Sequence, residues 1–303
     1  MKTCELIILG AGPAGITAAV YAARKKIDFL VITLDIGGQA ALSGDIENYT
    51  GYQFISGPEL ALKFEEHMRA FGIKVNMPEN VADIEKEGKL IKTITNKTEY
   101  LSKTIIVTTG KRPRMLGVQG EKEFKNKGVT YCATCDGPLF KDKNVAVIGG
   151  GNSALDAALG LIKICPKIYI INIASNLTGD SVMIETLEKA PNVEIYNNTK
   201  VKSIRGDNFV KSMEIEKESK VQTLAVEGIF VEIGLIPNSD FSEIVKHNEL
   251  GEIIVDCHNG TNIEGVFAAG DVTNVPEKQI IIACGEGSKA CLAAFKYIST
   301  HKF

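Results

Sequence analysis

The sequence predicts an α/β fold of two Rossmann-like, three-layer ββα-type nucleotide-binding domains, with the second inserted into the first. An apolar strand, a glycine cluster and an alanine-rich helix follow one another twice, in residues 6–26 and 144–164. Proline-bearing, turn-rich stretches at residues 111–117 and 234–238 bracket the middle of the chain. A length of 303 residues is also large for one hydrophobic core. The predicted domains are an outer one, residues 1–113 with 240–303, and an inner one, residues 114–239.

The first glycine cluster, Gly-Ala-Gly-Pro-Ala-Gly at residues 10–15, has the dinucleotide-binding fingerprint in the context that it requires. It follows an apolar strand and opens a helix. Gly10 permits a tight turn, Gly12 lets the backbone approach a pyrophosphate, and Gly15 lets the helix lie close to the sheet. A generic tight turn is the alternative, but the flanking strand and helix favour a nucleotide bound at the helix N-terminus.

Three further strands and a helix complete the outer domain. A strand at residues 29–33 precedes Asp35, whose carboxylate could bind ribose hydroxyls. Apolar strands at residues 105–107 and 265–269 each run into a turn that contains glycine. The last helix, at about residues 285–299, has alanines and a phenylalanine at helical spacing and is expected to close the domain.

The most informative stretch is Tyr-Cys-Ala-Thr-Cys-Asp-Gly-Pro at residues 131–138 of the inner domain. Two residues separate Cys132 from Cys135, which is typical of thiols that open and close a small disulfide ring. Asp136 follows at once and could exchange protons with a thiol or with a redox cofactor. Half of a zinc site and an inert buried pair are the alternatives. No second cysteine or histidine pair supplies the four ligands of structural zinc, so we predict a redox pair and no metal.

Composition narrows the classes of partner. A net charge of −3 gives no reason to expect nucleic acid or an anionic membrane. No apolar run reaches the roughly 18 residues that span a bilayer. The N-terminus has no signal-peptide pattern, so we expect a cytoplasmic protein. The other five of the seven cysteines are scattered and are expected to behave as small core residues.

Several segments occur in the order found in the low-molecular-weight thioredoxin reductases. They are the turn at residues 10–15, Gly37-Gly38-Gln39, Glu47-Asn48, Thr109-Gly110, the Cys-Ala-Thr-Cys-Asp segment, and residues 149–154 and 265–271. The chain resembles this family over essentially its whole length. The Cys-Ala-Thr-Cys-Asp-Gly segment between two dinucleotide folds is the most specific part of the resemblance.

The resemblance implies a function for each of these segments. Cys135 would be the thiol next to the flavin, Cys132 the thiol that attacks the protein substrate, and Asp136 the acid or base. It also implies thioredoxin as substrate and a homodimer whose inner domain swings on the two linkers. FAD would be bound by Gly10, Gly12, Pro13, Ala14, Gly15, Gly38, Gln39, Asn48, Thr109, Gly110, Gly270, Asp271, Lys278, Gln279 and Ile280.

One segment departs from the family pattern. The family holds the 2′-phosphate of NADPH with a His-Arg-Arg-x-x-x-Arg segment, but here the strand at residues 168–171 is followed by Asn-Ile-Ala-Ser-Asn-Leu-Thr. Residues 168–188 contain no lysine or arginine. Losing three charge-assisted contacts of roughly 1.5 kcal/mol each should weaken NADPH binding by over about a thousandfold. NADH is not favoured either, because no acidic residue ends the strand to bind its ribose.

The chain therefore resembles most closely the ferredoxin-dependent flavin thioredoxin reductases, which lack the NADPH motif. That resemblance implies that reduced ferredoxin supplies single electrons to FAD. Basic segments at residues 24–26, 111–114 and 122–127 are candidates for docking an acidic ferredoxin, but an ordinary solvated face is the more common role of such segments, so no docking site is assigned. Two alternatives stay open. One is an NADPH- or NADH-dependent reductase with an atypical clamp, such as Lys200 or Lys202. The other is a redox-sensing flavoprotein without turnover.

Overall fold

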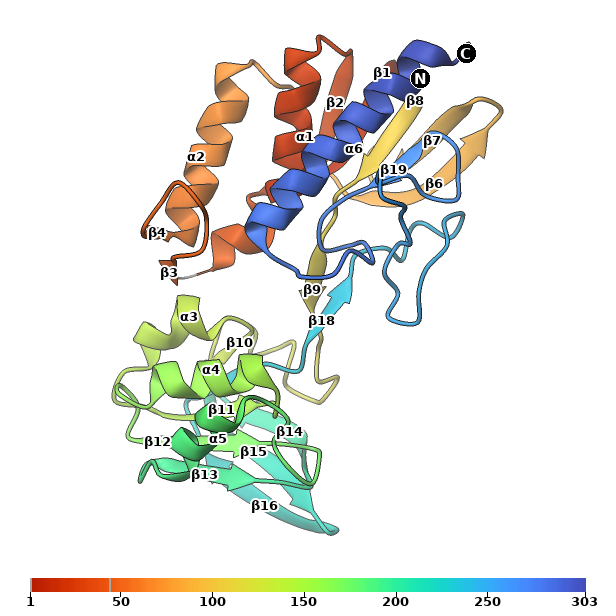
Figure 1. The fold of residues 1–303 in the computed structure, drawn as a ribbon. Coiled ribbons are helices and arrows are strands. Elements are labelled where there is room, and N and C mark those ends of the chain that lie inside the picture. The colour runs from red at the N-terminus through yellow and green to blue at the C-terminus, as the bar shows by residue number, and fades with distance from the viewer. Residues whose placement is uncertain (1, 44) are drawn as a thin grey trace. The chain divides into compact units, whose positions relative to one another are not determined.

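The computed structural model in Figure 1 describes residues 2–43 and 45–303, with the backbone alone for residues 2, 45, 134 and 135. The chain divides into two compact units. The outer unit is Met1–Arg112 with Ile236–Phe303, and the inserted unit is Pro113–Leu235. The sequence placed these junctions after residues 113 and 239. Each unit contains a parallel sheet with helices on it, which confirms the predicted α/β fold with one nucleotide-binding-type domain inserted into another.

The outer unit is built on a sheet of order β5-β2-β1-β8-β7-β6, with β19 paired to β8. The pairs among β5, β2, β1, β8 and β19 are parallel, and β6, β7 and β8 are antiparallel. The strands are β1 (Lys2–Ala11), β2 (Phe29–Ile36), β5 (Val75–Asn76), β6 (Val81–Glu87), β7 (Leu90–Thr95), β8 (Glu99–Val107) and β19 (Val266–Ala268). The other elements are α1 (Pro13–Arg24), η1 (Gly38–Leu42), β3 (Asp45–Ile46), β4 (Ile55–Ser56), α2 (Gly57–Ala70) and α6 (Ile280–Thr300).

Strand β1 is the centre of the outer unit because both of its faces are covered. Leu6 and Ile8 pack into the core beneath α1 and α6, which Figure 1 shows side by side on one face of the sheet. Ile7 and Leu9 pack into a second core on the opposite face. All four side chains are fully buried. A continuous apolar run is the pattern expected of a parallel strand covered on both faces.

Two predicted boundaries in the outer unit were wrong. Strand β2 continues to Ile36, so Asp35 lies within the strand and not after it. Helix α6 begins at Ile280, earlier than the predicted residue 285. Glycine inside the helix obscured its start, although Gly287 is needed for packing: a Cβ there would lie 2.1 Å from the Ala14 carbonyl oxygen of α1.

The inserted unit has a five-stranded parallel sheet of order β10-β17-β11-β12-β13 and a three-stranded antiparallel sheet, β14-β15-β16. Val145 and Val147 of β11 pack toward α4, while Ala146 and Ile148 pack toward the antiparallel sheet. These are the three predicted layers. The elements are β10 (Val129–Thr130), α3 (Ala133–Asp136), η2 (Gly137–Phe140), β11 (Asn144–Ile148), α4 (Asn152–Leu161), β12 (Lys167–Ile171), α5 (Ser181–Glu188), β13 (Val193–Tyr196), β14 (Thr199–Gly206), β15 (Val210–Lys217), β16 (Lys220–Ala225) and β17 (Gly228–Val231).

The two segments predicted as linkers form short strands. Strand β9 (Lys111–Pro113) pairs with β18 (Leu235–Pro237) in a two-stranded sheet of their own. Among the helices that the structure describes, none has the length and apolar character needed to cross a membrane.

Candidate functional site

The first glycine turn joins β1 to α1. Its glycines Gly10 and Gly15 are packed against backbone atoms, whereas Gly12 faces space that no described atom fills. Gly10 has a φ of +105°, and a Cβ there would lie 2.5 Å from the Thr108 carbonyl oxygen. A Cβ on Gly15 would lie 1.9 Å from the Gly10 carbonyl oxygen. At Gly12, the N-cap of α1, a Cβ would meet no described atom within 4 Å. No side chain caps α1, so its first amides face this open space, as an anion-binding turn requires.

Two glycines from distant segments close around the start of α1. A Cβ on Gly38, where φ is +52°, would lie 3.3 Å from the Cα of Gly12. A Cβ on Gly270, where φ is +77°, would lie 3.0 Å from the Cβ of Ala14. The structure therefore brings these predicted cofactor residues together at one end of the outer sheet. Because these glycines have no side chains, a group such as a pyrophosphate can approach the protein backbone there.

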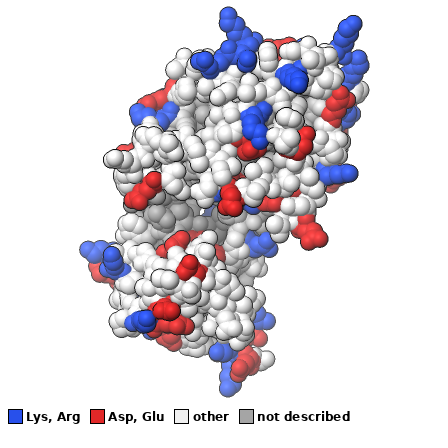
Figure 2. Space-filling view, viewed as in Figure 1, with Lys and Arg blue, Asp and Glu red and all other residues white. Residues whose placement is uncertain are grey.

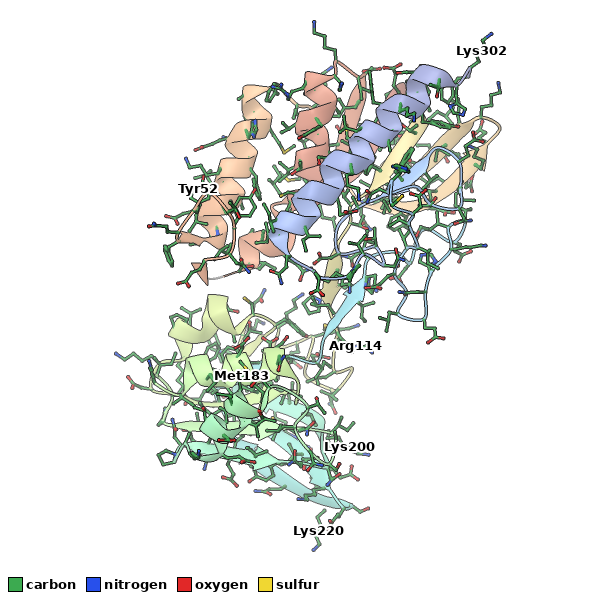
Figure 3. The ribbon with its side chains drawn as sticks, viewed as in Figure 1. Tyr52, Arg114, Met183, Lys200, Lys220 and Lys302 are labelled. Atoms are coloured by element: carbon green, nitrogen blue, oxygen red, sulfur yellow. The ribbon has the colours of Figure 1, made fainter. Side chains whose placement is uncertain are left out.

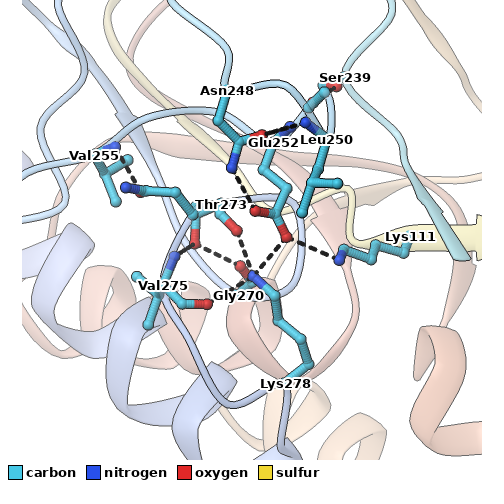
Figure 4. A network of polar contacts seen from close by, with 12 residues as sticks. Lys111, Ser239, Asn248, Leu250, Glu252, Val255, Gly270, Thr273, Val275 and Lys278 are labelled. Atoms are coloured by element: carbon cyan, nitrogen blue, oxygen red, sulfur yellow. Dashed lines mark hydrogen bonds and ion pairs between the residues drawn. The ribbon is translucent and has the colours of Figure 1, made fainter. Parts of the chain in front are cut away.

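Glu252 anchors a polar network beside this turn, shown in Figure 4. Its side chain is 7% exposed and lies 2.9 Å from Lys111 Nζ and 3.1 Å from Lys278 Nζ. The Asn248 amide donates to the other carboxylate oxygen at 2.7 Å. Burial alone would raise the pKa of Glu252, but donation from Lys111, Asn248 and Lys278 outweighs it and lowers the pKa to about 2. The carboxylate is therefore charged and fully compensated.

Lys278, which the resemblance assigned to FAD, is engaged within the protein. Its Nζ donates to the carbonyl oxygens of Thr273 at 2.5 Å and Val275 at 2.6 Å, besides its contact with Glu252. These bonds fix the loop that follows Asp271. Burial raises the pKa of Asp271, and the charges of Lys278 and Lys111 act against that rise. Lys278 thus positions the Asp271 loop through its own hydrogen bonds.

The remaining predicted cofactor residues of the outer unit fall into local groups. The Asn48 amide donates to Gln279 Oε1 at 3.0 Å, although 231 residues separate them. Thr109 Oγ1 donates to the Asn238 carbonyl oxygen at 2.6 Å, and the backbone amide of Asn238 donates to the Gly110 carbonyl oxygen at 2.9 Å. Asp35 is exposed. Pro13 opens α1, Gln39 lies in η1, and Ile280 opens α6.

The second glycine turn, residues 149–151, joins β11 to α4; it is crowded at Gly149 and Gly150, whereas a Cβ on Gly151 would meet only Thr178 Oγ1, at 4.0 Å. Gly149 has a φ of +140°, and a Cβ there would lie 2.3 Å from the Glu232 carbonyl oxygen. A Cβ on Gly150 would lie 2.5 Å from Asn172 Oδ1. The Thr178 amide donates to the Gly150 carbonyl oxygen at 2.7 Å. We call residues 172–180 the covering segment, because they fold against this turn.

Asn172 is the centre of the covering segment. It is 4% exposed, and its Nδ2 lies 2.8 Å from both the Asn176 carbonyl oxygen and Asn197 Oδ1. Its Oδ1 accepts from the Ala174 amide at 3.2 Å. The side chain at the end of β12 is therefore occupied in local hydrogen bonds. In a dinucleotide-binding fold, an acidic residue at this position binds the ribose hydroxyls.

Lys200 and Lys202, the candidate alternative clamp, belong to the antiparallel sheet. Figure 3 shows Lys200 on this sheet and Met183 on the side of α5. The Nζ atoms of Lys200 and Lys202 lie 3.8 Å and 2.8 Å from Glu216 Oε2. Both lysines are therefore paired with a carboxylate of the neighbouring strand.

Some side chains of the basic segments proposed for docking contact other groups of the protein. Lys111 contacts Glu252, Arg112 Nη2 lies 2.6 Å from Asp240 Oδ2, and Lys25 Nζ lies 4.9 Å from the centre of the Phe295 ring. On the face shown in Figure 2, acidic and basic side chains are interspersed and do not gather in one broad patch. This face gives no support for assigning a docking surface.

The redox motif lies in the inserted unit, after β10. Cys132 is disulfide-bonded. Its amide donates to Thr130 Oγ1 at 3.2 Å, and the Thr130 hydroxyl donates to Asp136 Oδ2. The Asp136 amide donates to the Cys132 carbonyl oxygen at 3.1 Å. Thr130, which the sequence did not single out, thus links Cys132 and Asp136, two of the three predicted catalytic residues. The side chain of Cys135 lies outside what the structure describes.

Two carboxylates near the motif were not predicted. Glu121, 1% exposed, accepts from the Tyr131 hydroxyl at 2.9 Å and from the Leu116 and Gly117 amides at 2.7 Å. Burial raises the pKa of Glu232 to about 7, and the backbone amide of Ala133 acts against that rise. A glutamate directly after the apolar run at residues 228–231 was the available signal. Among the residues whose side chains are described, no group of three acidic, cysteine or histidine residues could hold a metal.

Comparisons with known proteins give the chain a family. The pyridine nucleotide-disulphide oxidoreductase family model matches residues 4–287. Among curated relatives, a protein of Ferdinandcohnia aciditolerans named NADH dehydrogenase is 42% identical over 97% of the chain and 57% of the relative. A component of the alkyl hydroperoxide reductase of Staphylococcus aureus is 41% identical over 97% of the chain and 59% of the relative. The chain thus spans less than two thirds of these relatives' length.

Solved structures match along the whole chain. A thioredoxin reductase of Lactococcus lactis is 36% identical, with a TM-score of 0.85 over 98% of this chain and all of that one. A ferredoxin-flavin thioredoxin reductase of Clostridium acetobutylicum is 30% identical, with a TM-score of 0.56 over 99% of this chain and all of that one. The two names share a disulfide-reducing activity and differ in that only the second names ferredoxin.

Proposed function

Because the chain belongs to the pyridine nucleotide-disulphide oxidoreductase family, whose members are FAD-binding flavoproteins, we propose that it is a ferredoxin-driven thioredoxin reductase. The Cys132–Cys135 disulfide takes up two electrons and two protons to give a dithiol, which then reduces a disulfide of thioredoxin by thiol–disulfide exchange. The observation that carries this proposal is the disulfide-bonded Cys132 in a motif that Thr130 ties to Asp136. A pair of this kind suits a reductase that passes two electrons on to the disulfide of a partner protein.

The outer unit has the features needed to hold FAD. The open space above Gly12 and the uncapped start of α1 suit a pyrophosphate. Gly38 and Gly270 leave room beside it, and Asp271 follows on a loop fixed by Lys278. Bound FAD supplies both one-electron and two-electron chemistry. The predicted residues would therefore hold a group that can collect single electrons and release a pair.

The inserted unit supports a donor other than a nicotinamide. The covering segment lies on the second glycine turn, and Asn172 is saturated by local hydrogen bonds. Lys200 and Lys202 are paired with Glu216. A phosphorylated ribose normally needs charge-assisted, often bidentate donors, and the described side chains of residues 168–188 include no cation. Reduced ferredoxin fits this chemistry because it delivers electrons without a dinucleotide site.

NADH is the second candidate donor. The curated relatives are named as an NADH dehydrogenase and as a component of alkyl hydroperoxide reductase, so the disulfide could serve a peroxide-reducing partner in place of thioredoxin. A redox-sensing flavoprotein without turnover is a third possibility. It predicts no thioredoxin reduction with any donor, dithionite-reduced ferredoxin included. The homodimer and the cytoplasmic location stay predictions from the sequence.

The donor test separates these candidates. The FAD-loaded protein is mixed anaerobically with NADPH, with NADH, or with reduced ferredoxin, and the visible flavin absorbance is followed. We expect bleaching by ferredoxin alone, followed by reduction of added thioredoxin. Prompt bleaching by NADH or NADPH would reject ferredoxin as the required donor. Bleaching by ferredoxin without reduction of thioredoxin would reject the thioredoxin reductase activity.

A further inference from the structure

Thr130 is the last residue of β10 and directly precedes the redox motif of the inserted unit. Its side chain is buried, at 5% exposure. Strand β10 pairs in parallel with β17, and Thr130 lies opposite Phe230 in that pairing. The position of the Thr130 hydroxyl is therefore set by the parallel sheet at the core of the unit.

Three hydrogen bonds join Thr130, Cys132 and Asp136 in a closed ring. The Cys132 amide donates to Thr130 Oγ1 at 3.2 Å. The Asp136 amide donates to the Cys132 carbonyl oxygen at 3.1 Å. The Thr130 hydroxyl closes the ring by donating to Asp136 Oδ2. Both the backbone and the carboxyl group of Asp136 are thus tied to a strand of the sheet.

The ring fixes the direction of the bond between Thr130 and Asp136. A hydroxyl has one hydrogen to donate and two lone pairs that accept. One lone pair of Thr130 Oγ1 takes the Cys132 amide, and among the described residues Asp136 Oδ2 is the only acceptor for the hydroxyl hydrogen. Oδ2 is therefore the accepting oxygen of Asp136. A proton that Asp136 binds or releases belongs on its other oxygen, Oδ1.

A second polar network flanks the motif and does not include Asp136. The Tyr131 hydroxyl donates to Glu121 Oε1 at 2.9 Å, and two backbone amides donate to the same carboxyl group at 2.7 Å. Removing the Tyr131 hydroxyl would disturb the motif through its packing alone. Removing the Thr130 hydroxyl would also take away a partner of Asp136. The two networks therefore provide a comparison within one motif.

Other ionisable side chains are few on the elements around α3. Helix α3 packs mainly against η2, which has no ionisable side chain, and against α4, whose Asp156 is exposed. Strands β10 and β17 contribute none, and Glu232 directly follows β17. Among the described residues, Thr130 is the only one whose side chain hydrogen-bonds to Asp136. The position of this carboxyl group thus depends on one hydroxyl.

We propose that Thr130 is a positioning residue that holds Asp136 by Oδ2 and leaves Oδ1 as the oxygen that exchanges a proton. The inference rests on the proposed disulfide reductase function. In that function the S–S bond breaks, and two electrons from reduced FAD and two protons give a dithiol. Asp136, in its predicted acid–base role, gives one of these protons from Oδ1 and takes a replacement from water. Thr130 acts on the reaction only through Asp136.

The test is a double-mutant cycle in the full FAD-loaded chain. Thioredoxin reduction is measured with whichever donor bleaches the flavin in the donor test. Thr130→Val removes the hydroxyl at nearly constant volume, and Thr130→Ser keeps it. Each change is made in the wild type and in Asp136→Asn, which cannot exchange the proton. Tyr131→Phe, made in the same two backgrounds, is the matched control, because it breaks the neighbouring network without removing a partner of Asp136.

We expect Thr130→Val to lower turnover by about tenfold in the wild type, which is part of the roughly 10²–10⁴-fold that a positioned acid or base contributes. In Asp136→Asn the same change should lower turnover by less than about twofold, because the group that Thr130 positions no longer exchanges a proton. Thr130→Ser should stay close to the wild type, and Tyr131→Phe should have the same effect in both backgrounds. Equal losses from Thr130→Val with and without the Asp136 carboxyl would overturn the inference.

A spectroscopic measurement tests the hydrogen bond without turnover. Aspartate labelled with carbon-13 in the side-chain carboxyl is incorporated, and the Asp136 resonance is the one that Asp136→Asn removes. Thr130→Val should move this resonance and Tyr131→Phe should not, so a resonance that Thr130→Val leaves in place would also reject the inference. If Thr130→Val does not fold, Thr130→Ala removes the same hydroxyl and replaces it in both experiments. Absence of wild-type turnover with every donor would overturn the proposed function, and the resonance would still decide whether Thr130 holds Asp136.

Discussion

The glycine turns of the two units are alike at the start of the helix, where a Cβ on Gly12 would meet no described atom within 4 Å and one on Gly151 would meet only Thr178 Oγ1, at 4.0 Å. They differ in the side chains that lie against them. Both turns follow a parallel strand, and both begin with a positive-φ glycine, Gly10 or Gly149, closed by a neighbouring carbonyl oxygen. In the outer unit Thr33 of β2 accepts from the Ala11 amide at 3.1 Å, whereas in the inserted unit Asn172 lies against Gly150 and is occupied in local hydrogen bonds. The backbone design is thus shared, and the side chains around each turn distinguish the two units.

The residues that contact the two turns also differ. In the outer unit Gly38 and Gly270 approach the start of α1 without side chains. In the inserted unit Asn172 reaches Gly150, and Glu232 occupies the position of Thr108. We propose that the outer unit binds the cofactor and that the inserted unit carries the disulfide chemistry. Four predictions test this division, from the largest expected effect to the smallest.

Cys135→Ser should abolish thioredoxin reduction while FAD stays bound, because the disulfide belongs to the inserted unit and the cofactor to the outer one. A loss of more than about a thousandfold in turnover is expected when a covalent redox partner is removed. Turnover with reduced ferredoxin measures the loss of thioredoxin reduction, and the flavin absorbance of the purified variant shows whether FAD stays bound. Full activity in the variant would reject the thiol mechanism.

Asn172→Ala should destabilise the inserted unit by about 3 kcal/mol, because its removal leaves buried backbone groups without partners. The side chain is 4% exposed and bonds the covering segment through both of its polar atoms. Urea unfolding measures the change, with Asn176→Ala, an exposed position of the same segment, as control. Equal stability of the two variants would show that Asn172 does not hold the covering segment in place.

Gly12→Ala should weaken FAD binding by about 2–3 kcal/mol with little change in stability. The added Cβ meets no described atom within 4 Å, so only a ligand at the turn would feel it. Gly151→Ala is the matched control, because its Cβ would lie 4.0 Å from Thr178 Oγ1, an ordinary contact. FAD titration of both apoproteins is the measurement. If Gly151→Ala weakens FAD binding as much, the assignment of the cofactor to the outer turn is wrong.

Glu232→Gln should remove a pH dependence of stability worth about 1–2 kcal/mol. Folding raises the Glu232 pKa from 4.5 to about 7. As the pH rises from 4.5 to about 7, the carboxyl ionises in the unfolded chain while it stays protonated in the folded one. The folded wild type therefore loses stability over this pH range. Thermal unfolding at pH 5 and pH 8 should show a smaller difference in the variant. Thr108 has no carboxyl, so Thr108→Ser should leave the wild-type difference unchanged.

Local patterns were enough to predict the two strand–turn–helix repeats, the inserted order of the domains and the redox motif. Glycines at residues 10–15, the apolar run at residues 6–9 and the Cys132–Cys135 spacing depend on neighbours in the chain, so their physical meaning can be read from a short window. The predicted start of α6 was less accurate, because glycines such as Gly285 and Gly287 usually mark the end of a helix and here lie inside one. Gly287 is present because α1 passes within contact distance.

What the sequence alone determined is the set of chemical groups: a nucleotide-binding turn, a dithiol motif, and a second turn without cations. The tertiary structure decided what each group faces. It brought Lys111 and Lys278 to Glu252, paired Lys200 and Lys202 with Glu216, and directed Glu232 to Ala133. Such partners lie far apart in the chain. Burial and charge compensation depend on distances in space, and sequence spacing does not encode them.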